Sequence, residues 1–348
     1  KKKYLWKLLY MVILGYDVDF GHYEAATLIN AARFSEKYTG YIGLSLMATE
    51  KDTDIFIKIA QSIRNDLLSS NEVNQSLAIS TIGTLAPKEL VDAMSKDIEK
   101  IALSDTVRMP IFIRKKAILC LLRLFRKFRE LYTNTEGWSR AIYTMLDQKN
   151  LGFLSSTVSL LTGVATLSPN PAFEESVPKL ISILQKLVLQ RDCSPDYLYY
   201  KTPNPWLIVK LLKALQLFPP PESSNFLAIA SDALLKIVTK TEVTRNVNKN
   251  NTDHGILFEA INLIVHYRNA LHSDLKNQAI SLLGVFISVR EPNIRYLALE
   301  AISKFSDTPH AENLIQEHLK TILKLLRDND VSIRRRALDI LYIMCTPA

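Results

Sequence analysis

Apolar residues recur along most of the chain at the spacing of one face of an α-helix. Near the start, this spacing is met by Leu5, Leu8, Leu9, Val12 and Ile13. Gly15 follows where such a helix would end. Similar segments, separated by short polar breaks, occupy residues 24–32, 55–68, 74–85, 114–128, 153–167, 177–189, 206–218, 225–238, 256–266, 275–289, 294–305 and 311–326. The alternation typical of strands is hardly visible, so the pattern predicts an all-α protein.

A short motif recurs along the chain. The motif, in which Ile-Arg is followed by any two residues and then by Ala, begins at Ile113, Ile294 and Ile333. Together with weaker copies at Val73, Leu154 and Ala260, the motif keeps an interval of about 40 residues, which is typical of paired-helix HEAT and armadillo repeats. We therefore expect a HEAT/armadillo-like α-α superhelical solenoid, with residues 1–348 as a single continuous repeat domain.

The motif residues have expected roles in such a stack. The small Ala would let the helix pack closely on its neighbours. The Arg would reach an acidic side chain or a backbone carbonyl of the adjacent repeat. Asp328 and Asp330 would lie near a helix start, where negative charge is favoured.

Two stretches interrupt the repeat pattern. Residues 193–205 hold three tyrosines and three prolines, and residues 239–254 are rich in Asn, Lys and Thr. We expect the second stretch to be a mobile loop between repeats. The prolines at 219–221 are expected to end a helix.

Composition narrows the class of protein. Only 10 of 348 residues are Gly, which leaves little material for tight turns or phosphate-binding loops. No apolar run approaches the ~20 residues of a membrane span. The cysteines Cys120, Cys193 and Cys345 are odd in number and far apart, which favours a reducing, cytoplasmic setting. Because the chain begins at Lys1 and stops just after a helical pattern, we expect a piece of a longer protein.

No set of residues in the sequence points to catalysis. His254, His266 and His272 lack a consistent ligand spacing. Asp17 and Asp19 resemble a metal-binding pair without the other ligands of a calcium loop, so a turn or cap role is favoured. Cys193 lies near Asp192, but no His is paired with it in the sequence. We expect neither an enzyme nor a cofactor or metal.

The net charge of +8 suggests contact with a polyanion, either a membrane surface, a phosphoinositide or a nucleic acid. A dense basic cluster opens the chain with Lys1, Lys2, Lys3, Tyr4 and Lys7. Residues i and i+4 share a helix face, so Lys3 and Lys7 would project together beside the N–H groups of a helix start. The cluster fits a multiply phosphorylated headgroup, and the residues alone leave open a merely solvated run of charge.

Two further basic clusters are expected mostly to face solvent or to link neighbouring repeats. One contains Arg114, Lys115, Lys116, Arg123, Arg126, Lys127 and Arg129. The other is Arg334, Arg335 and Arg336. Either cluster could add a diffuse contact with an anionic surface.

Several segments resemble the large adaptins of clathrin adaptor complexes, above all the alpha type of the plasma-membrane complex. Lys1-Lys2-Lys3-Tyr4 with Lys7-Leu8-Leu9 carries the resemblance at the start, followed by Gly15-Tyr16-Asp17-Val18-Asp19-Phe20-Gly21-His22. The most discriminating segment is Tyr199-Tyr200 with Pro203-Asn204-Pro205-Trp206-Leu207 and Pro219-Pro220-Pro221. The resemblance covers nearly the whole chain and is weakest at residues 239–254.

The resemblance implies a non-enzymatic trunk in a heterotetramer with a beta-type large adaptin, a medium chain and a small chain. Such complexes act in clathrin-mediated endocytosis, where they recruit clathrin and select cargo by its sorting signals. The family's basic motif, which binds phosphatidylinositol bisphosphate or inositol polyphosphate, corresponds here to Lys1, Lys3, Tyr4 and Lys7, with Lys2 adjacent. It further implies a cytoplasmic protein peripheral on the plasma membrane at coated pits.

Two alternatives remain open at this point. One is a large adaptin of an internal-membrane complex of the Golgi or endosomes. The other is a nuclear-transport or nucleic-acid-binding helical-repeat scaffold, which would need basic and aromatic residues interleaved along one concave face. The resemblance argues against nucleic acid as a partner.

Overall fold

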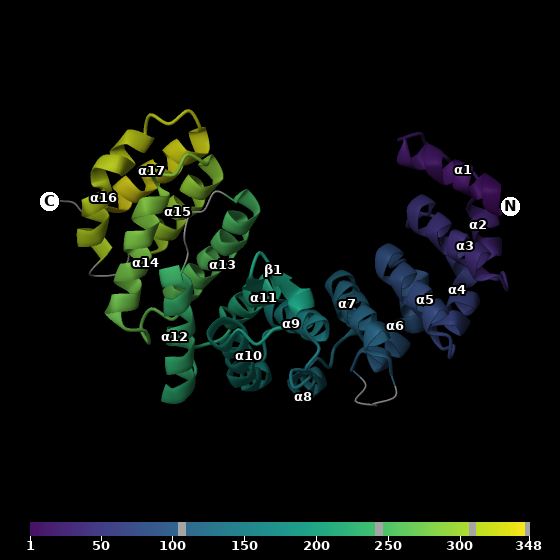
Figure 1. Cartoon of the computed structure of the whole chain (residues 1–348). Coiled ribbons are helices and arrows are strands. Elements are labelled where there is room, and N and C mark those ends of the chain that lie inside the picture. The colour runs from purple at the N-terminus through teal and green to yellow at the C-terminus, as the bar shows by residue number, and fades with distance from the viewer. Residues whose placement is uncertain (104–108, 241–245, 306–310, 345–348) are drawn as a thin grey trace. The chain divides into compact units, whose positions relative to one another are not determined.

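The computed structural model describes residues 1–103, 109–240, 246–305 and 311–344, and nearly all of this part of the chain is α-helical. The chain divides into two compact units, Lys1–Phe173 and Glu174–Ala348 (Figure 1). The expected all-α solenoid is confirmed within each unit, because each is a stack of helix pairs. That residues 1–348 act as one repeat domain stays a prediction.

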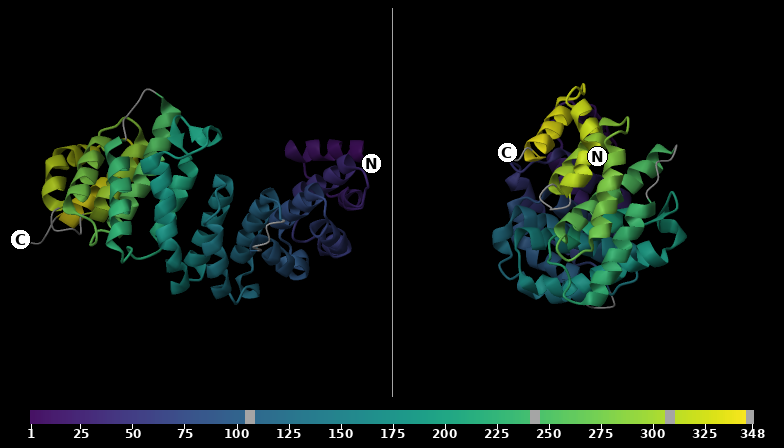
Figure 2. Two further views of the ribbon diagram at one scale, coloured as in Figure 1. Left: turned by 60° about the horizontal axis from the view of Figure 1, so that its bottom comes forward. Right: turned by 90° about the vertical axis from the view of Figure 1, so that its left-hand side faces the viewer.

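The first unit has two layers of helices. Its helices are α1 (Lys2–Ile13), α2 (His22–Ile29), α3 (Phe34–Met47), α4 (Thr53–Leu67), α5 (Glu72–Leu85), α6 (Lys88–Leu103), α7 (Ile111–Lys127), the 3-10 turn η1 (Arg129–Leu131), α8 (Glu136–Met145) and α9 (Leu151–Leu167). In one layer α1, α3, α5, α7 and α9 pack in succession, and in the other α2, α4, α6 and α8 do so (Figures 1 and 2). Each even helix also packs on the odd helix that follows it.

The second unit repeats this arrangement. After the 3-10 turn η2 (Pro171–Ser176), its elements are α10 (Val177–Gln185), the π-helical η3 (Lys186–Gln190), the 3-10 turn η4 (Pro195–Tyr197), β1 (Leu198–Tyr199), β2 (Thr202–Pro203), α11 (Pro205–Leu215), α12 (Ser224–Lys240), α13 (Val247–His266), α14 (Ser273–Phe286), α15 (Pro292–Phe305), α16 (Ala311–Leu325) and α17 (Val331–Met344). The odd helices α11, α13, α15 and α17 form one layer, and the even helices from α10 to α16 form the other.

Every copy of the repeated sequence motif falls on the second helix of a pair. Its copies lie on α5, α7, α9, α13, α15 and α17. The alanines Ala117, Ala298 and Ala337 are fully buried, so the close packing expected of a small side chain is confirmed. Gly40 on α3 also permits close packing, because a Cβ at this position would lie only 2.7 Å from the backbone oxygen of Ala25 on α2. Only glycine allows these two helices to approach so closely.

The stretch at residues 193–205 is a turn with a small hairpin. β1 pairs antiparallel with β2, and Leu198 lies opposite Pro203. Tyr200 and Lys201 form the turn with positive φ angles of 45° and 67°. Asn204 then caps α11, because its side chain accepts a hydrogen bond from the Leu207 N–H.

The prediction of a loop over residues 239–254 is wrong for most of that stretch. α12 continues to Lys240 and α13 begins at Val247, while residues 241–245 lie outside the described part. Asn246 starts α13 by accepting a hydrogen bond from the Lys249 N–H at 3.0 Å. The first two turns of α13 carry few apolar residues, so they lack the spacing by which helices were predicted.

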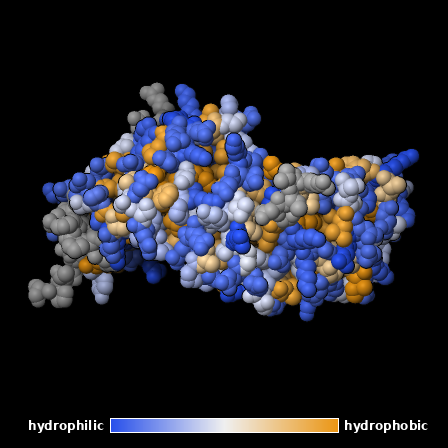
Figure 3. All heavy atoms as spheres, turned by 90° about the horizontal axis from the view of Figure 1, so that it is seen from below, coloured by the Kyte–Doolittle hydropathy of each residue, from blue (hydrophilic) through white to orange (hydrophobic). Residues whose placement is uncertain are grey.

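The surface is mixed in character. On the face drawn in Figure 3, hydrophobic residues form small groups separated by hydrophilic ones. Among the described residues, no helix combines the length and the apolar character that crossing a membrane would require.

Candidate functional site

The basic cluster at the start of the chain lies on α1, which has one packed face and one open face. Leu5 and Leu9 are buried where α1 packs on α3. Lys3 and Lys7 are exposed on the opposite side, and Tyr4 is 69% exposed. The local cause is the sequence pattern, since apolar residues spaced for one helix face leave the lysines on the other.

The five predicted site residues are not equivalent. The Lys7 Nζ lies 5.8 Å from the centre of the Tyr4 ring, a cation–π contact that joins these two side chains. Lys1 caps the helix, and its carbonyl accepts hydrogen bonds from the Tyr4 and Leu5 N–H groups. Lys2 is half-buried, on the side of the helix that Leu5 and Leu9 occupy. Lys3, Tyr4 and Lys7 therefore form the outward-facing group, with Lys1 beside it and Lys2 turned inward.

The electrostatics of this group favour an anion. The first turn of α1 holds no acidic residue, and no ion pair joins Lys1, Lys2, Lys3 or Lys7 to a carboxylate of the described residues. A helix start adds outward-pointing N–H groups and positive dipole potential to these charges. The arrangement can therefore bind a densely charged anion.

The basic cluster on α7 has the opposite character. Lys116 donates to the Ser80 Oγ at 2.8 Å, and Arg123 donates to the Thr84 carbonyl at 3.0 Å, both on α5. Lys127 donates to the Ala86 carbonyl at 2.7 Å and also pairs with Glu50. Arg114 is buried and lies 4.9 Å from the Phe153 ring of α9. For these four residues, the predicted role of linking neighbouring repeats is confirmed.

In the α17 cluster, one arginine reaches the neighbouring repeat, one contacts the preceding loop, and Arg335 is exposed. Arg336 donates to the Tyr296 hydroxyl of α15 at 3.0 Å, and Arg334 donates to the Asp328 carbonyl at 2.7 Å. On α15, Arg295 pairs with Asp328 at 2.9 Å, which confirms the expected reach of the motif arginine to the next repeat. Asp330 accepts from the Ser332 N–H, as expected of an acidic residue at a helix start.

The remaining candidates lie apart from one another. Asp17 and Asp19 are exposed between α1 and α2, whose N-cap is Gly21, so they do not cap that helix. Burial raises the pKa of the Cys193 thiol, which disfavours a reactive thiolate. His266 contacts the Phe218 carbonyl, and His254 is buried against Phe286. Within the described ranges, no three His, Cys, Asp or Glu side chains gather closely enough to hold a metal ion. Cys345 lies outside those ranges.

Comparison with known proteins identifies the family. The family described as Adaptin N terminal region matches residues 1–348. The AP-2 complex subunit alpha-1 of Arabidopsis thaliana is 43% identical over 347 residues, which cover 99% of this chain and 33% of the relative. The AP-2 complex subunit alpha-2 of Dictyostelium discoideum is 39% identical over 348 residues, or 34% of its own length. The chain thus spans about a third of the length of these curated relatives.

A comparison of structures agrees on the fold. A homology model of the full-length AP-3 complex in an intermediate open conformation contains a chain that matches 99% of this one, with a TM-score of 0.59. That chain is 22% identical and 54% covered, so the likeness shows the fold alone. The chain belongs to the adaptin family, and along its whole length it is similar to the alpha subunits of AP-2 complexes.

Proposed function

We propose that the chain is the trunk of an alpha-type large subunit in a plasma-membrane clathrin adaptor, where it acts as a non-enzymatic scaffold in endocytosis and cargo selection. The start of α1 binds the headgroup of phosphatidylinositol bisphosphate, or a soluble inositol polyphosphate. The observation that carries this proposal is the exposed group Lys3, Tyr4 and Lys7, which faces away from the packed side of α1 without an acidic partner among the described residues. The similarity to AP-2 alpha subunits supports it.

The expected strength of this contact is modest. Each lysine near an anionic bilayer contributes about 1 kcal/mol, so Lys1, Lys3 and Lys7 together supply about 3 kcal/mol. A value of that size gives reversible docking. Stable recruitment then depends on several such contacts acting at once across the assembled complex.

The site is tested by reversing its charge. Lys1→Glu, Lys3→Glu and Lys7→Glu together should abolish binding of the chain to vesicles that contain phosphatidylinositol bisphosphate. The matched control replaces three exposed lysines elsewhere in the first unit, Lys51, Lys88 and Lys149, with Glu. The two variants have the same net charge, so a loss confined to the first variant assigns the site. An equal loss in both variants would reduce the proposal to non-specific attraction.

The proposed partners are a beta-type large adaptin, a medium chain and a small chain, with clathrin and cargo reached through the complex. A second feature of α1 supports protein contacts. Trp6, Tyr10 and Ile13 share one helix face and are 42%, 64% and 69% exposed. Apolar side chains so exposed on consecutive turns are typical of a surface that another protein or segment covers.

This surface can be tested separately from the lipid site. Tyr10→Ala should lower the capture of a co-expressed small adaptor chain, while binding to vesicles is retained because no charge changes. Capture of the small chain at the unaltered level would show that the open face of α1 is not its docking surface.

A further inference from the structure

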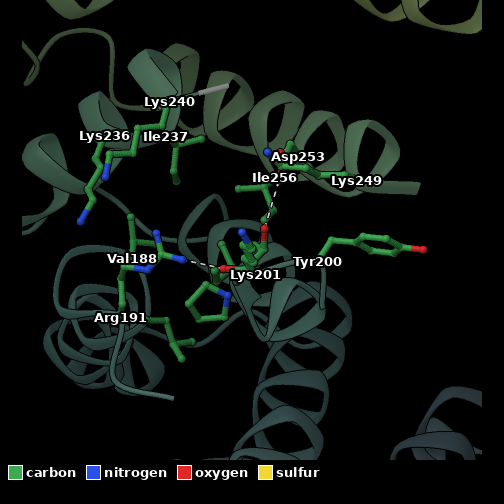
Figure 4. Close-up of a pocket in the computed structure, with 14 residues that line it drawn as sticks. Val188, Arg191, Tyr200, Lys201, Lys236, Ile237, Lys240, Lys249, Asp253 and Ile256 are labelled. Atoms are coloured by element: carbon green, nitrogen blue, oxygen red, sulfur yellow. Dashed lines mark hydrogen bonds between the residues drawn. The ribbon is translucent and has the colours of Figure 1, made fainter. Parts of the chain in front are cut away.

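A cleft of about 290 Å³ lies wholly within the second unit, where η3, the β1–β2 hairpin, α12 and α13 meet. Its apolar lining includes Val188, Ile237 and Ile256. Five basic side chains from these four segments line it as well, namely Arg191, Lys201, Lys236, Lys240 and Lys249. Figure 4 shows Lys236 and Lys240 on one side of the cleft and Lys249 and Asp253 on another, with Arg191 and Lys201 across from them.

Two of these cations are held in place by backbone carbonyls. Arg191 donates to the Lys201 carbonyl at 2.6 Å, and Lys236 donates to the Leu189 carbonyl at 2.8 Å. A carbonyl orients a cation without neutralising its charge. Burial lowers the pKa of Lys236, and the charges of Lys240 and Arg191 lower it further.

The cleft holds little negative charge to balance these cations. Asp253 is the one carboxylate among its described lining residues, and its Oδ1 accepts a hydrogen bond from the Thr202 hydroxyl at 3.2 Å. None of the five cations forms an ion pair with a described carboxylate. The excess of positive charge is therefore left for a ligand.

The backbone around the cleft is strained. The described residues include five non-glycine positions with positive φ, and four of them fall between Arg191 and Asn204. Arg191 and Lys201, with φ angles of 57° and 67°, are themselves cleft cations. Such conformations cost of order 1 kcal/mol or more each and cluster at binding sites, where they aim side chains that a relaxed turn would direct elsewhere.

We propose that this cleft is a second anion site, which binds a compact, multiply phosphorylated small molecule, either free or as a lipid headgroup. Five cations from four segments surround a small volume, so a ligand that balances them must carry several negative charges close together. A phosphate group carries nearly two negative charges and several acceptor oxygens, whereas an acidic peptide offers one charge per residue at intervals of about 3.3 Å. The site is separate from the start of α1 and does not depend on the role proposed for Lys3, Tyr4 and Lys7.

The test uses the 348-residue chain in a Lys1→Glu, Lys3→Glu, Lys7→Glu background, so that binding reports on the cleft. Isothermal titration with inositol hexakisphosphate should give saturable binding near one site. Adding Lys201→Glu and Lys249→Glu should weaken it at least tenfold. Adding Lys186→Glu and Lys320→Glu, two exposed lysines that do not line the cleft, should change it less than twofold. Absence of binding in the background, or equal losses in the two variants, would overturn the proposal.

A second variant separates binding from folding. Lys201→Gly removes a cation and relieves a positive φ, so it should raise or preserve the unfolding midpoint while affinity falls. If this variant binds the phosphate probe with unchanged affinity, Lys201 is not part of a site.

Two further binding experiments identify the kind of ligand. Vesicles containing phosphatidylinositol bisphosphate that compete with the soluble probe would assign the cleft to a headgroup, and failure to compete would assign it to a free anion. An oligoglutamate peptide that binds more tightly than inositol hexakisphosphate would refute the phosphate assignment.

Discussion

Both α1 and α7 carry a cluster of basic residues, yet the fold uses the two clusters in opposite ways. On α7, Lys116, Arg123 and Lys127 donate to oxygen atoms of α5 and of the Ala86 turn beyond it. On α1, Lys3 and Lys7 stand exposed, and Lys7 contacts only the Tyr4 ring in the described contacts. A basic cluster in the sequence thus links neighbouring repeats in one place, and in another it forms an exposed group that we propose to bind an anion.

Whether a basic side chain is paired or exposed depends on the oxygen atoms that lie near its helix. A helix inside the stack lies beside the carbonyl ends and acidic groups of the helices on either side, and long basic side chains reach them. The open face of α1 has no described helix packed on it, so its lysines meet solvent. The comparison predicts that changes to paired cations alter stability, whereas changes to unpaired ones alter binding.

The largest effect on stability is expected at a paired lysine. Lys37 on α3 pairs with Asp66 on α4 at 2.6 Å, and both side chains are nearly buried. The Tyr41 hydroxyl donates to the same carboxylate at 2.7 Å, and burial together with this contact raises the pKa of Tyr41. Asp66→Ala should lower the free energy of unfolding by about 3–5 kcal/mol, because it leaves Lys37 charged and without its partner. Urea titration followed by circular dichroism measures the loss.

The control for this prediction replaces all three polar groups of the contact. Lys37→Met and Asp66→Leu together with Tyr41→Phe should recover most of the stability, since apolar side chains of similar volume leave neither a buried charge nor an unpaired hydroxyl. Equal losses in the single and triple variants would show that packing, not pairing, stabilises this contact.

A smaller loss is expected where an arginine joins two repeats. Arg295 donates to Asp328 and to the carbonyls of Val289 and Arg290. Arg295→Met should lower the free energy of unfolding by about 1.5–3 kcal/mol, because it removes hydrogen bonds of a charged group and breaks the ion pair of Asp328. Arg290→Met is the matched control, since that side chain is exposed. Similar losses in the two variants would contradict the linking role.

Changes to the exposed lysines of α1 should alter vesicle binding and leave stability unchanged. Lys7→Ala should lower affinity for vesicles with phosphatidylinositol bisphosphate by about fivefold, equivalent to about 1 kcal/mol, with the unfolding midpoint unchanged. Arg123→Ala, which breaks a bond to α5, should lower the midpoint and leave vesicle affinity unchanged. Vesicle sedimentation and thermal unfolding of the same preparations test both halves. A variant that lowers both the vesicle affinity and the unfolding midpoint would contradict the distinction between paired and exposed basic clusters.

Local pattern predicts most of this fold and only part of the sites. The helices that became α5, α7 and α15 follow from apolar spacing, and the α1 cluster follows from five nearby residues. α3 escaped prediction because it buries Thr39, Gly40 and Gly43 beside larger apolar residues, which blurs the apolar stripe. No short stretch of the sequence predicts the cleft of the second unit. Its cations are spread along the sequence from Arg191 to Lys249 and come together only when α12 and α13 pack.

The smallest expected effect is a change in the pH dependence of stability. It arises where a basic side chain is buried without a hydrogen-bond partner among the described residues. His254 is 4% exposed, and neither ring nitrogen has a hydrogen-bond partner among the described residues. Burial lowers the pKa of His254, although Glu291 and Asp253 act in the opposite sense. The folded chain therefore protonates the ring at a lower pH than the unfolded chain, which takes up the proton near pH 6.5.

The sign of the resulting pH dependence follows from this difference. Stability from His254 is fully present above about pH 6.5 and is lost as the pH falls below it, because the unfolded state then binds the extra proton. His254→Leu should consequently show a smaller drop in unfolding midpoint between pH 7.5 and 5.5 than the unaltered chain. His272→Leu, at an exposed position, should keep the full drop. Equal pH dependence in the unaltered chain and the His254 variant would mean that the ring has the same pKa in the folded and unfolded chain, and that burial does not disfavour its charged form.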